Sequence, residues 1–204
     1  MHRIFSKVAA EDNSGASLWL KMDHPIVIGI GGFASEVGKT TLLCQLLRAF
    51  PGWEAIKTTR GHYRSCGKDP AACCVSHLLA AEPVVRSGRE ATYEFGKDTG
   101  RYWDAGASNV HWLIATDDQI EAGIKQALAR VKAPGVFVEG NSFAQFVPVD
   151  VFVMVRRSDD NKIKKSARRA LADADVIYVS DQHDPMAVIS RIKSVVEESS
   201  GAVA

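Results

Sequence analysis

The chain has 204 residues, of which 46% are hydrophobic and 24% are charged, and its formal net charge is +1. This length suffices for one domain with a sizeable core, and the balanced charge argues against a general affinity for nucleic acid. Since no apolar run approaches the roughly 20 residues of a membrane helix and residues 8–16 are too polar for a signal peptide, we expect a cytoplasmic protein without membrane or nucleic-acid partners.

The N-terminal half predicts two strand–helix units after an irregular start. Residues 1–24 show no clear period, so we expect a loose arm there and one domain over residues 25–204. A continuous apolar run, "PIVIGI", predicts a buried parallel strand at 25–30, and "KTTLLCQLLRAF" predicts a helix at 39–50. "WEAIKTT" predicts a second strand at 53–59, and "DPAACCVSHLLAAE" a helix at 69–82 with proline in its first turn.

The remaining chain repeats this alternation. Four short runs rich in β-branched residues predict strands, and three amphipathic segments predict helices. Alternating strands and helices pair in parallel through right-handed crossovers. We therefore expect an α/β fold with three layers and a mostly parallel central sheet. The strands are expected at 109–116, 135–140, 149–155 and 175–180, and the helices at 117–131, 159–173 and 184–199.

The segment between the first strand and the first helix, "GGFASEVGKTT", has the character of a phosphate-binding loop. The usual pattern is G-x-x-x-x-G-K-[ST]. Counting back from Gly38 places Phe33 where the first glycine belongs, and Gly32 comes one residue too early. The loop is thus one residue longer than the usual pattern, but it lies in the strand-to-helix context that the pattern requires.

The longer loop keeps the groups that bind phosphate. Backbone N–H groups at a helix N-terminus can face phosphate oxygens, and glycine permits the turn. A solvent-facing lysine would attract the β- and γ-phosphates, and the following threonine hydroxyl would bind Mg²⁺. The loop therefore predicts a site for GTP or ATP with Mg²⁺. Its expected ligands are Gly32, Glu36, Val37, Gly38, Lys39, Thr40 and Thr41.

Three charged residues at or near strand ends are further candidates, because ligands of open α/β sheets lie at the carboxyl ends of the strands. Glu139 ends a predicted strand and would reach the metal or its water; its alternative role is to brace a loop or cap a helix. Asp98 competes for the metal role. Lys57 is expected at the end of the second strand, where it would neutralise charge on transferring phosphoryl oxygens, or lie on the surface with its stem on apolar residues.

Two stretches of sequence resemble known P-loop proteins. "GFASEVGKT" (32–40) resembles the loop of dethiobiotin synthetase. Over about residues 25–145, "IKTTRGH", "FGKDTGRYWDAGASNV" and "GVFVEGNSF" resemble the molybdopterin-guanine dinucleotide biosynthesis protein B family. The chain departs from that family in a longer, cysteine-bearing stretch after the second strand and in two further strand–helix units at its end. The matching residues are Gly96, Lys97, Asp98, Thr99, Arg101, Ala105, Gly106, Ala107, Glu139 and Gly140.

These resemblances imply three alternative functions. The longer one implies a P-loop NTPase, with GTP favoured over ATP, that assists molybdenum cofactor biosynthesis. It also implies a molybdopterin nucleotide or a metalloenzyme as partner, and a homodimer. Hydrolysis by this NTPase is expected to be slow, because no arginine finger or water-positioning glutamine is readable in the sequence. The loop that resembles dethiobiotin synthetase implies an ATP-dependent ligase that activates a carboxylate. The third alternative is a nucleotide-gated binding module for metalloenzyme maturation.

Residues that recognise the nucleobase are expected after the strand at 175–180. "DQHD" (181–184) keeps only the last position of the N-K-x-D pattern with which GTPases bind guanine, which is Asp184. The same Asp184, followed by Pro185, has the pattern of an N-cap with proline at the first helical position. The basic segment "KIKKSARR" (162–169) indicates a solvated helix face or a contact with an acidic partner.

Three cysteines in the stretch after the second strand, Cys66, Cys73 and Cys74, are candidates for zinc or iron–sulfur ligation. Cys73 and Cys74 would point about 100° apart on a helix, which makes joint ligation awkward. The alternative is that all three are small buried residues. Cys44, on the first predicted helix, is expected in the core.

Overall fold

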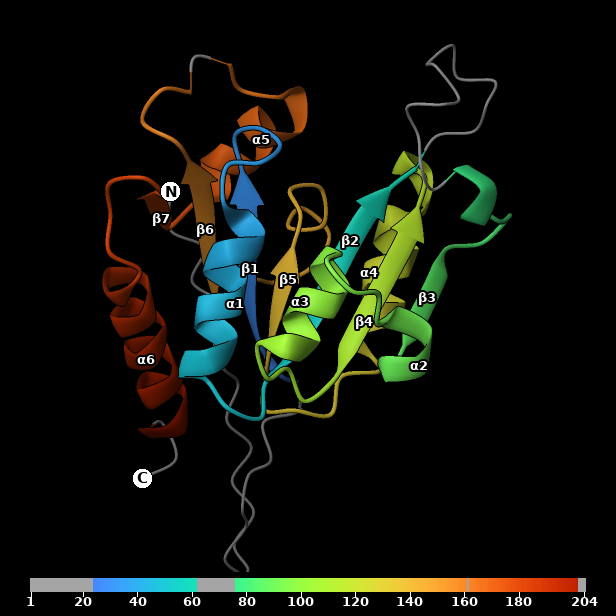
Figure 1. The fold of residues 1–204 in the computed structure, drawn as a ribbon, viewed down its shortest axis with the longest axis horizontal. Helices are drawn as coiled ribbons and strands as arrows, with labels where there is room; N and C mark the ends of the chain where they lie inside the picture. The colour runs from blue at the N-terminus through green and yellow to red at the C-terminus, as the bar shows by residue number, and fades with distance from the viewer. Residues whose placement is uncertain (1–23, 62–75, 161, 202–204) are drawn as a thin grey trace, which may run out of the picture.

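The structure is a computed structural model that describes residues 24–61, 76–160 and 162–201 (Figure 1). Its centre is a seven-stranded sheet of order β3-β4-β2-β5-β1-β6-β7. Neighbouring strands are parallel except for the antiparallel pair β3 and β4. The strands are β1 (Ile26–Gly32), β2 (Glu54–Arg60), β3 (Val84–Ser87), β4 (Val110–Ala115), β5 (Gly135–Glu139), β6 (Val151–Arg156) and β7 (Val176–Val179).

Helices cover both faces of the sheet. Figure 1 shows α1, α3 and α6 in front of the strands and α4 behind them. Two apolar clusters fill the spaces between the layers, one under α1, α3 and α6 and one under α4 and α5. The expected three-layer α/β fold with a mostly parallel sheet is confirmed. The helices are α1 (Lys39–Ala49), α2 (Arg89–Thr92), α3 (Asp98–Asp104), α4 (Ile120–Leu128), α5 (Lys165–Ala170) and α6 (Met186–Gly201), with single turns η3 (Ser76–Leu78), η4 (Asp117–Gln119) and η5 (Leu171–Asp173).

The central strands explain why the sequence reads as continuous apolar runs. Every residue of β1 and of β5 is buried, because both strands lie between two helical layers and between other strands. β1 pairs with β5 on one side and β6 on the other. The carboxyl ends of these three strands therefore meet at one edge of the sheet, next to the start of α1.

The outer part of the fold differs from the sequence prediction. Within the described residues, the helix expected at 69–82 is only the single turn η3, followed by an irregular stretch that ends at Pro83. The structure adds β3, α2 and α3, which the sequence analysis did not predict. β3 has four residues and pairs with a single neighbour, so its apolar run is too short to stand out.

The helix expected from residue 159 begins only at Lys165. Lys164 has an extended backbone, with φ −60° and ψ 150°, and its N–H donates to the carbonyl oxygen of Phe33 at 3.0 Å. This contact with the β1–α1 loop replaces the helical hydrogen bond that the local sequence favours. A tertiary contact thus overrides a local helical pattern here.

Some expectations fall outside the described residues. These are the arm at 1–24, apart from its last residue, and the three cysteines Cys66, Cys73 and Cys74. Cys44 is buried in the core as expected, with its thiol 3.5 Å from the carbonyl oxygen of Arg101. None of the helices in the described part of the chain is long and apolar enough to cross a membrane.

Candidate nucleotide site

The loop between β1 and α1 begins with the residue that makes it longer than usual. Phe33 is buried; its N–H donates to Val155 at 2.9 Å and its carbonyl oxygen accepts from Lys164. Phe33 therefore continues the pairing of β1 with β6 before the chain turns. The extra residue belongs to the strand side of the loop and leaves the turn toward α1 intact.

The turn itself exposes a run of backbone amides. Glu36 and Gly38 have positive φ angles, 61° and 98°, and Glu36 is the one non-glycine residue of the described chain with such an angle. Gly38 is required at its position, because a Cβ there would lie 3.0 Å from the side chain of Ser180 and its φ is left-handed. Among the described residues, no acceptor receives the N–H groups of residues 35–41. Such a loop of unpaired amides at a helix N-terminus favours a bound anion.

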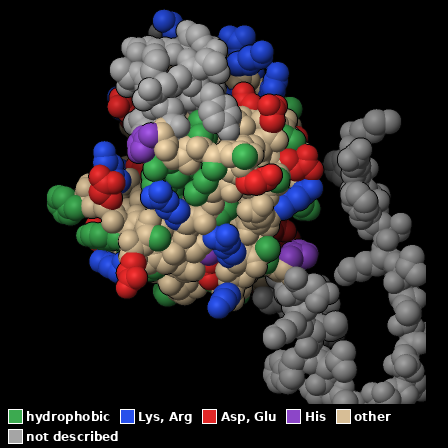
Figure 2. All heavy atoms as spheres, turned by 90° about the vertical axis from the view of Figure 1, so that its right-hand side faces the viewer, with side chains coloured by type: hydrophobic (Ala, Val, Ile, Leu, Met, Phe, Trp, Pro, Cys, Tyr) green, Lys and Arg blue, Asp and Glu red, His purple; other side chains and the backbone are tan. Residues whose placement is uncertain are grey.

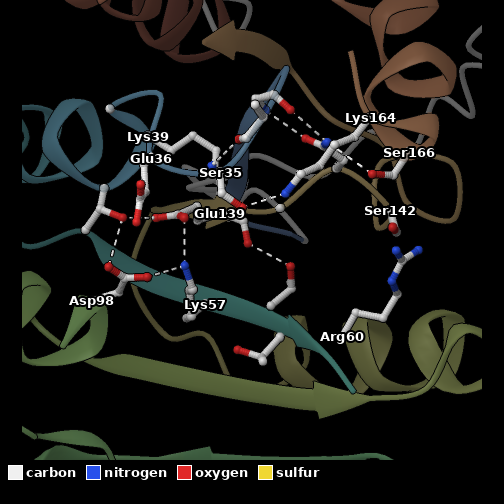
Figure 3. Close-up of a pocket in the computed structure, with 18 of the residues that line it drawn as sticks. Ser35, Glu36, Lys39, Lys57, Arg60, Asp98, Glu139, Ser142, Lys164 and Ser166 are labelled. Atoms are coloured by element: carbon white, nitrogen blue, oxygen red, sulfur yellow. Dashed lines mark hydrogen bonds and ion pairs between the residues drawn. The ribbon is translucent and has the colours of Figure 1, made fainter. Parts of the chain in front are cut away.

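The loop forms one wall of a cavity of about 700 Å³ (Figure 3). Two predicted ligands do not line it. Val37 is buried and lines only a smaller cavity on the other side of the loop, and Asp184 lines neither cavity. The predicted residues that do line the cavity come from the loop, from β2, from α3 and from the end of β5. They are Gly32, Glu36, Gly38, Lys39, Thr40, Thr41, Lys57, Asp98 and Glu139.

Three oxygen-bearing side chains converge at the start of α1. The Thr40 hydroxyl lies 2.9 Å from Oε2 of Glu139 and 3.1 Å from Oδ1 of Asp98. Glu139 is buried, with 2% of its surface exposed, whereas Asp98 is half-buried. Carboxylate and hydroxyl oxygens suit Mg²⁺, which prefers oxygen ligands. The two carboxylates that competed for one role in the sequence analysis therefore lie on either side of the same hydroxyl.

Lys57 lies between these carboxylates (Figure 3). Its ammonium nitrogen is 2.7 Å from Oε1 of Glu139 and also contacts Asp98. Burial alone would lower the pKa of Lys57, but the charges of Glu139 and Asp98 raise it above its ordinary value. Burial would raise the pKa of Asp98, but the Lys57 charge holds it below its ordinary value. A cation therefore already occupies the space between the two carboxylates, which shows that this pair attracts positive charge.

The position of Lys57 differs from the prediction. β2 continues to Arg60, so Lys57 lies three residues before the strand end. Its side chain still reaches the cavity because β2 pairs with β5 and Lys57 is in register with Glu139. Only 17% of the side chain is exposed, which does not fit the alternative of a surface lysine.

Lys39 is half-buried, whereas the sequence analysis expected it to face solvent. Its ammonium donates to the carbonyl oxygen of Ala34 at 3.2 Å, across the loop. Burial lowers the pKa of Lys39, and the nearby charges of Lys57 and Lys164 act in the same direction while Glu139 opposes them. Three lysines thus face one cavity, and their mutual repulsion favours a polyanionic ligand.

Sequence reasoning missed Lys164 as a site residue. Its ammonium donates to the Ser35 hydroxyl at 2.6 Å, and its backbone is tied to Phe33. It approaches the loop from the stretch before α5, opposite Lys57 in Figure 3. The basic run 162–169 marked the region, but only the tertiary fold separates the lysine that faces the loop from those that face away.

Two further missed residues hold the site in shape. Tyr102 of α3 is fully buried and donates its hydroxyl to Oε2 of Glu139; burial, with the Glu139 charge, raises the pKa of Tyr102 well above its ordinary value. Asn141 accepts from the Gly32 N–H at 2.8 Å and donates to the Gly32 carbonyl at 2.9 Å. Asn141 directly follows the strand end and glycine "EG", so the strand-end rule could have nominated it.

A smaller cavity of about 320 Å³ lies on the other side of the loop. It shares Glu36, Gly38 and Thr41 with the main cavity, and its outer wall includes Arg157, after β6, and Ser180, after β7. Asp184, predicted to read the base, does not line this cavity. Its carboxylate instead accepts the Met186 N–H at 2.8 Å at the start of α6, which is the geometry of the N-cap alternative.

The described residues contain no group of three or more His, Cys, Asp and Glu side chains that could hold a metal ion. A metal at this site would therefore have few protein ligands and would complete its shell with phosphate oxygens and water, as Mg²⁺ does in nucleotide sites. Thr40, Asp98 and Glu139 fit that role by chemistry and position.

Comparison with known proteins adds little to this geometry. No protein-family model matches the chain, and no curated protein matches it. Among solved structures, it is similar to the "apo" form of LpxK from Aquifex aeolicus in complex with ATP, at 14% sequence identity and a TM-score of 0.48. The match covers 79% of this chain, and the chain spans only 50% of LpxK. A likeness of that extent supports no conclusion about function.

Proposed function

We propose that the cavity binds a Mg²⁺–nucleoside triphosphate and that the protein hydrolyses it or transfers its γ-phosphoryl group. One observation carries this proposal: the unpaired amide loop, Lys39, Thr40 and the two carboxylates Asp98 and Glu139 all face the same cavity. A loop of amides favours an anion, and a hydroxyl beside two carboxylates suits a divalent cation; a Mg²⁺–triphosphate supplies both.

Each side chain has a defined task in this proposal. The phosphates lie on the amides of residues 35–41, and Lys39 leaves the Ala34 carbonyl to contact the β- and γ-phosphates. Thr40, Asp98 and Glu139 would hold the metal or its waters, and bound Mg²⁺ would neutralise charge on the phosphate oxygens. Lys57 then turns from the carboxylates toward the transferring phosphoryl group, where its charge stabilises the transition state.

Glu139 is oriented for this task before any ligand binds. Thr40, Lys57 and Tyr102 all donate hydrogen bonds to its carboxylate. When Lys57 turns toward the phosphoryl group, the hydrogen bonds from Thr40 and Tyr102 still hold the carboxylate in one orientation. Tyr102 acts through Glu139 and is a positioning residue.

We assign the nucleobase to the smaller cavity beside the loop, because the two cavities share Glu36, Gly38 and Thr41. GTP is the proposed nucleotide, on the resemblance to the molybdopterin-guanine dinucleotide family. Measuring GTP and ATP affinities with Mg²⁺ on the same sample decides between the two bases. A clear preference for ATP would remove the argument for a GTPase.

The proposed role is accessory to molybdenum cofactor biosynthesis, with a molybdopterin nucleotide or a metalloenzyme as partner and a homodimer as the working form. Its support is the segment "GKDTGRYWDAGA" (96–107), which forms α3 and brings Asp98 and Arg101 to the cavity. The segment that carries the resemblance is therefore also the one that carries a metal candidate. We place the nucleotide-binding domain at residues 25–204.

A second candidate function is ATP-dependent activation of a carboxylate. One observation favours it: another cavity, of about 650 Å³, adjoins the first at Lys57 and Asp98 and offers room for an acceptor. Turnover with diaminopelargonic acid and bicarbonate would identify a ligase of the dethiobiotin synthetase type. Nucleotide hydrolysis without any acceptor favours the first candidate.

The variant Glu139→Gln tests the catalytic assignment. The amide keeps the shape and the contact with Thr40 but loses the charge that orients the metal, so we expect nucleotide binding to persist and hydrolysis to slow about tenfold or more, which is about 1.4 kcal/mol per tenfold step. Binding and single-turnover hydrolysis should be measured together, with the exposed Glu121→Gln as the control. An unchanged rate in Glu139→Gln with a slow Asp98→Asn would move the metal role to Asp98; unchanged rates in both would contradict the assignment.

A further inference from the structure

The cavity of about 650 Å³ beside the nucleotide cavity has a distinct chemical character. Lys57, Thr59 and Asp98 line both cavities and form the junction between them. The second cavity lies over the outer strands β2, β4 and β3, on the side of the sheet that α2 and α3 partly cover. Nothing in the proposed nucleotide chemistry uses its remaining residues.

Its floor is a row of three side chains across three strands. Lys57 of β2 is in register with Trp112 of β4, and Trp112 is in register with Arg86 of β3. Registered partners project from the same face, and strands are about 4.8 Å apart, so the row spans about 10 Å from Lys57 to Arg86. Sheets covered by helices usually bury apolar side chains on that face. A lysine, a tryptophan and an arginine there, all half-buried, form a different kind of surface.

The indole in the middle of the row is fixed in place. Its Nε1 donates to the hydroxyl of Thr59 at 2.9 Å, and the guanidinium carbon of Arg86 lies 5.6 Å from its ring centroid. Tyr93 forms part of the same wall, with the guanidinium of Arg89 4.3 Å from its ring centroid. Two aromatic rings therefore line the cavity, and a guanidinium group lies over one face of each ring.

The positive charge at the outer end of the cavity is not neutralised within the described residues. No described carboxylate lies within ion-pair distance of Arg86 or of Lys97, which also lines the cavity. Asp98 is held by Lys57, and Glu94, on the same wall, pairs with neither cation. A half-buried guanidinium without a counter-ion favours a carboxylate, which it binds through two parallel hydrogen bonds. Figure 2, which faces this outer edge of the sheet, shows blue basic side chains among green hydrophobic and red acidic ones.

The geometry points to a binding site for a planar aromatic acid. The ring lies on Trp112, the carboxylate contacts Arg86, and the opposite edge of the ring system reaches the Lys57–Asp98 junction next to the nucleotide. A fused two-ring acid matches the span of the row. A role for this acid as the second ligand of the nucleotide reaction rests on the proposed function. Its binding to the cavity can be measured without nucleotide.

The experiment titrates the full chain with 2-naphthoate by calorimetry. Two probes isolate the features of the ligand: naphthalene-2-carboxamide lacks the charge, and the saturated decalin-2-carboxylate lacks the flat ring. A ligand of this size is expected to bind with a Kd of about 1 mM. Arg86→Gln should weaken 2-naphthoate about tenfold or more, because it removes the charged partner of the carboxylate. Trp112→Leu should weaken it similarly, and Arg168→Gln, an exposed position on α5, should leave it unchanged.

The outcomes separate this site from the nucleotide site. The inference is overturned if 2-naphthoate does not saturate the wild-type protein, if the carboxamide binds as tightly as the acid, or if Arg86→Gln keeps full affinity. Mg²⁺–nucleotide titrated into the same samples checks the proposed function separately, since Arg86 and Trp112 lie outside the nucleotide cavity. Thermal unfolding of Trp112→Leu shows whether that variant is folded. If it is not folded, the affinity of Arg86→Gln alone decides the test.

Discussion

Lys164 gives the cavity a cation that reaches the β1–α1 loop from the opposite side of the sheet. Its backbone donates to Phe33 and its side chain to Ser35, so the stretch before α5 is tied to the loop at two points. Phosphoryl transfer depends on a positive charge near the γ-phosphate, which an arginine finger supplies in many enzymes, and Arg60, Arg101 and Lys164 all line this cavity. We infer that Lys164 fills this position in the same chain.

The variant Lys164→Ala should slow hydrolysis about tenfold to hundredfold, because it removes one charge aimed at the transition state while Lys39 still binds the phosphates. The backbone contact with Phe33 does not depend on the side chain and should remain. Lys165→Ala is the matched control, since the next residue does not line the nucleotide cavity. Single-turnover rates and nucleotide affinity should be compared in both variants. Equal rates in the two variants would show that Lys164 has no specific role.

Among the elements, β2 links the nucleotide cavity to a buried carboxylate at the opposite end of the strand. Its residue Lys57 faces the nucleotide cavity, and its first residue, Glu54, is buried at the opposite end. Oε2 of Glu54 is 2.7 Å from Nε2 of His111, and Oε1 accepts the N–H groups of Lys132 at 2.9 Å and Ala133 at 3.1 Å. The carboxylate therefore joins β2 to β4 and to the turn before β5, and so fixes the register that places Lys57 opposite Glu139.

This cluster predicts a pH dependence of stability. Burial alone would raise the pKa of Glu54, but the hydrogen bond with His111 and those from Lys132 and Ala133 lower it below its ordinary value of 4.5. A group with a lowered pKa in the folded state stabilises the fold above its unfolded pKa, and this contribution is lost as the pH falls through the lowered value.

The variant Glu54→Gln should therefore lower the free energy of unfolding by about 1–3 kcal/mol at about pH 7, because it leaves buried donors poorly paired. The difference from wild type should shrink as the pH falls below 4.5. Urea unfolding across that range measures both. Glu121→Gln, in an exposed pair with Lys125, is the control and should change stability little. A difference that is the same at all pH values would contradict the argument.

The sequence allowed prediction of the elements whose pattern is local. β1, the loop and α1 follow from a continuous apolar run, a glycine turn and leucines at helical spacing. Glu139 could be nominated because ligands lie at the carboxyl ends of parallel strands, whereas Asp98, nominated beside it, is the first residue of α3 and ends no strand. The edge strand β3 could not be predicted, because a strand of four residues with one neighbouring strand leaves no distinct period in the sequence.

The contacts that complete the cavity could not be predicted, since they join residues far apart in sequence. The Tyr102 hydroxyl reaches Glu139, and the Lys164 ammonium reaches Ser35 across 129 positions. Neither residue differs in local sequence from a helical core tyrosine or a surface lysine. Asp184 shows the opposite case: a motif-like aspartate whose local pattern, an N-cap before proline, was the better guide to its geometry.

At the scale of the whole molecule, three cavities adjoin one another across the sheet. The smaller cavity near β6 and β7 shares the loop with the central one, and the central one shares Lys57, Thr59 and Asp98 with the outer one over β2, β4 and β3. Base, phosphates and a second ligand would thus lie in sequence across the sheet. Since Lys57 contacts both metal candidates and borders both larger cavities, we expect a ligand in one cavity to change the electrostatic potential in the other.

The central claim, nucleotide binding at the β1–α1 loop, is tested most directly by nucleotide-linked stabilisation of wild type and Lys39→Ala. Mg²⁺ with GTP or ATP at about 100 times the Kd should add about 2.7 kcal/mol to the free energy of unfolding and raise the Tm of wild type by about 5–10 °C. Lys39→Ala should keep the ligand-free Tm, since the side chain gives up only its bond with Ala34, and should show no shift. A shift in Lys39→Ala equal to that of wild type, or no shift in wild type with either nucleotide, would contradict the account.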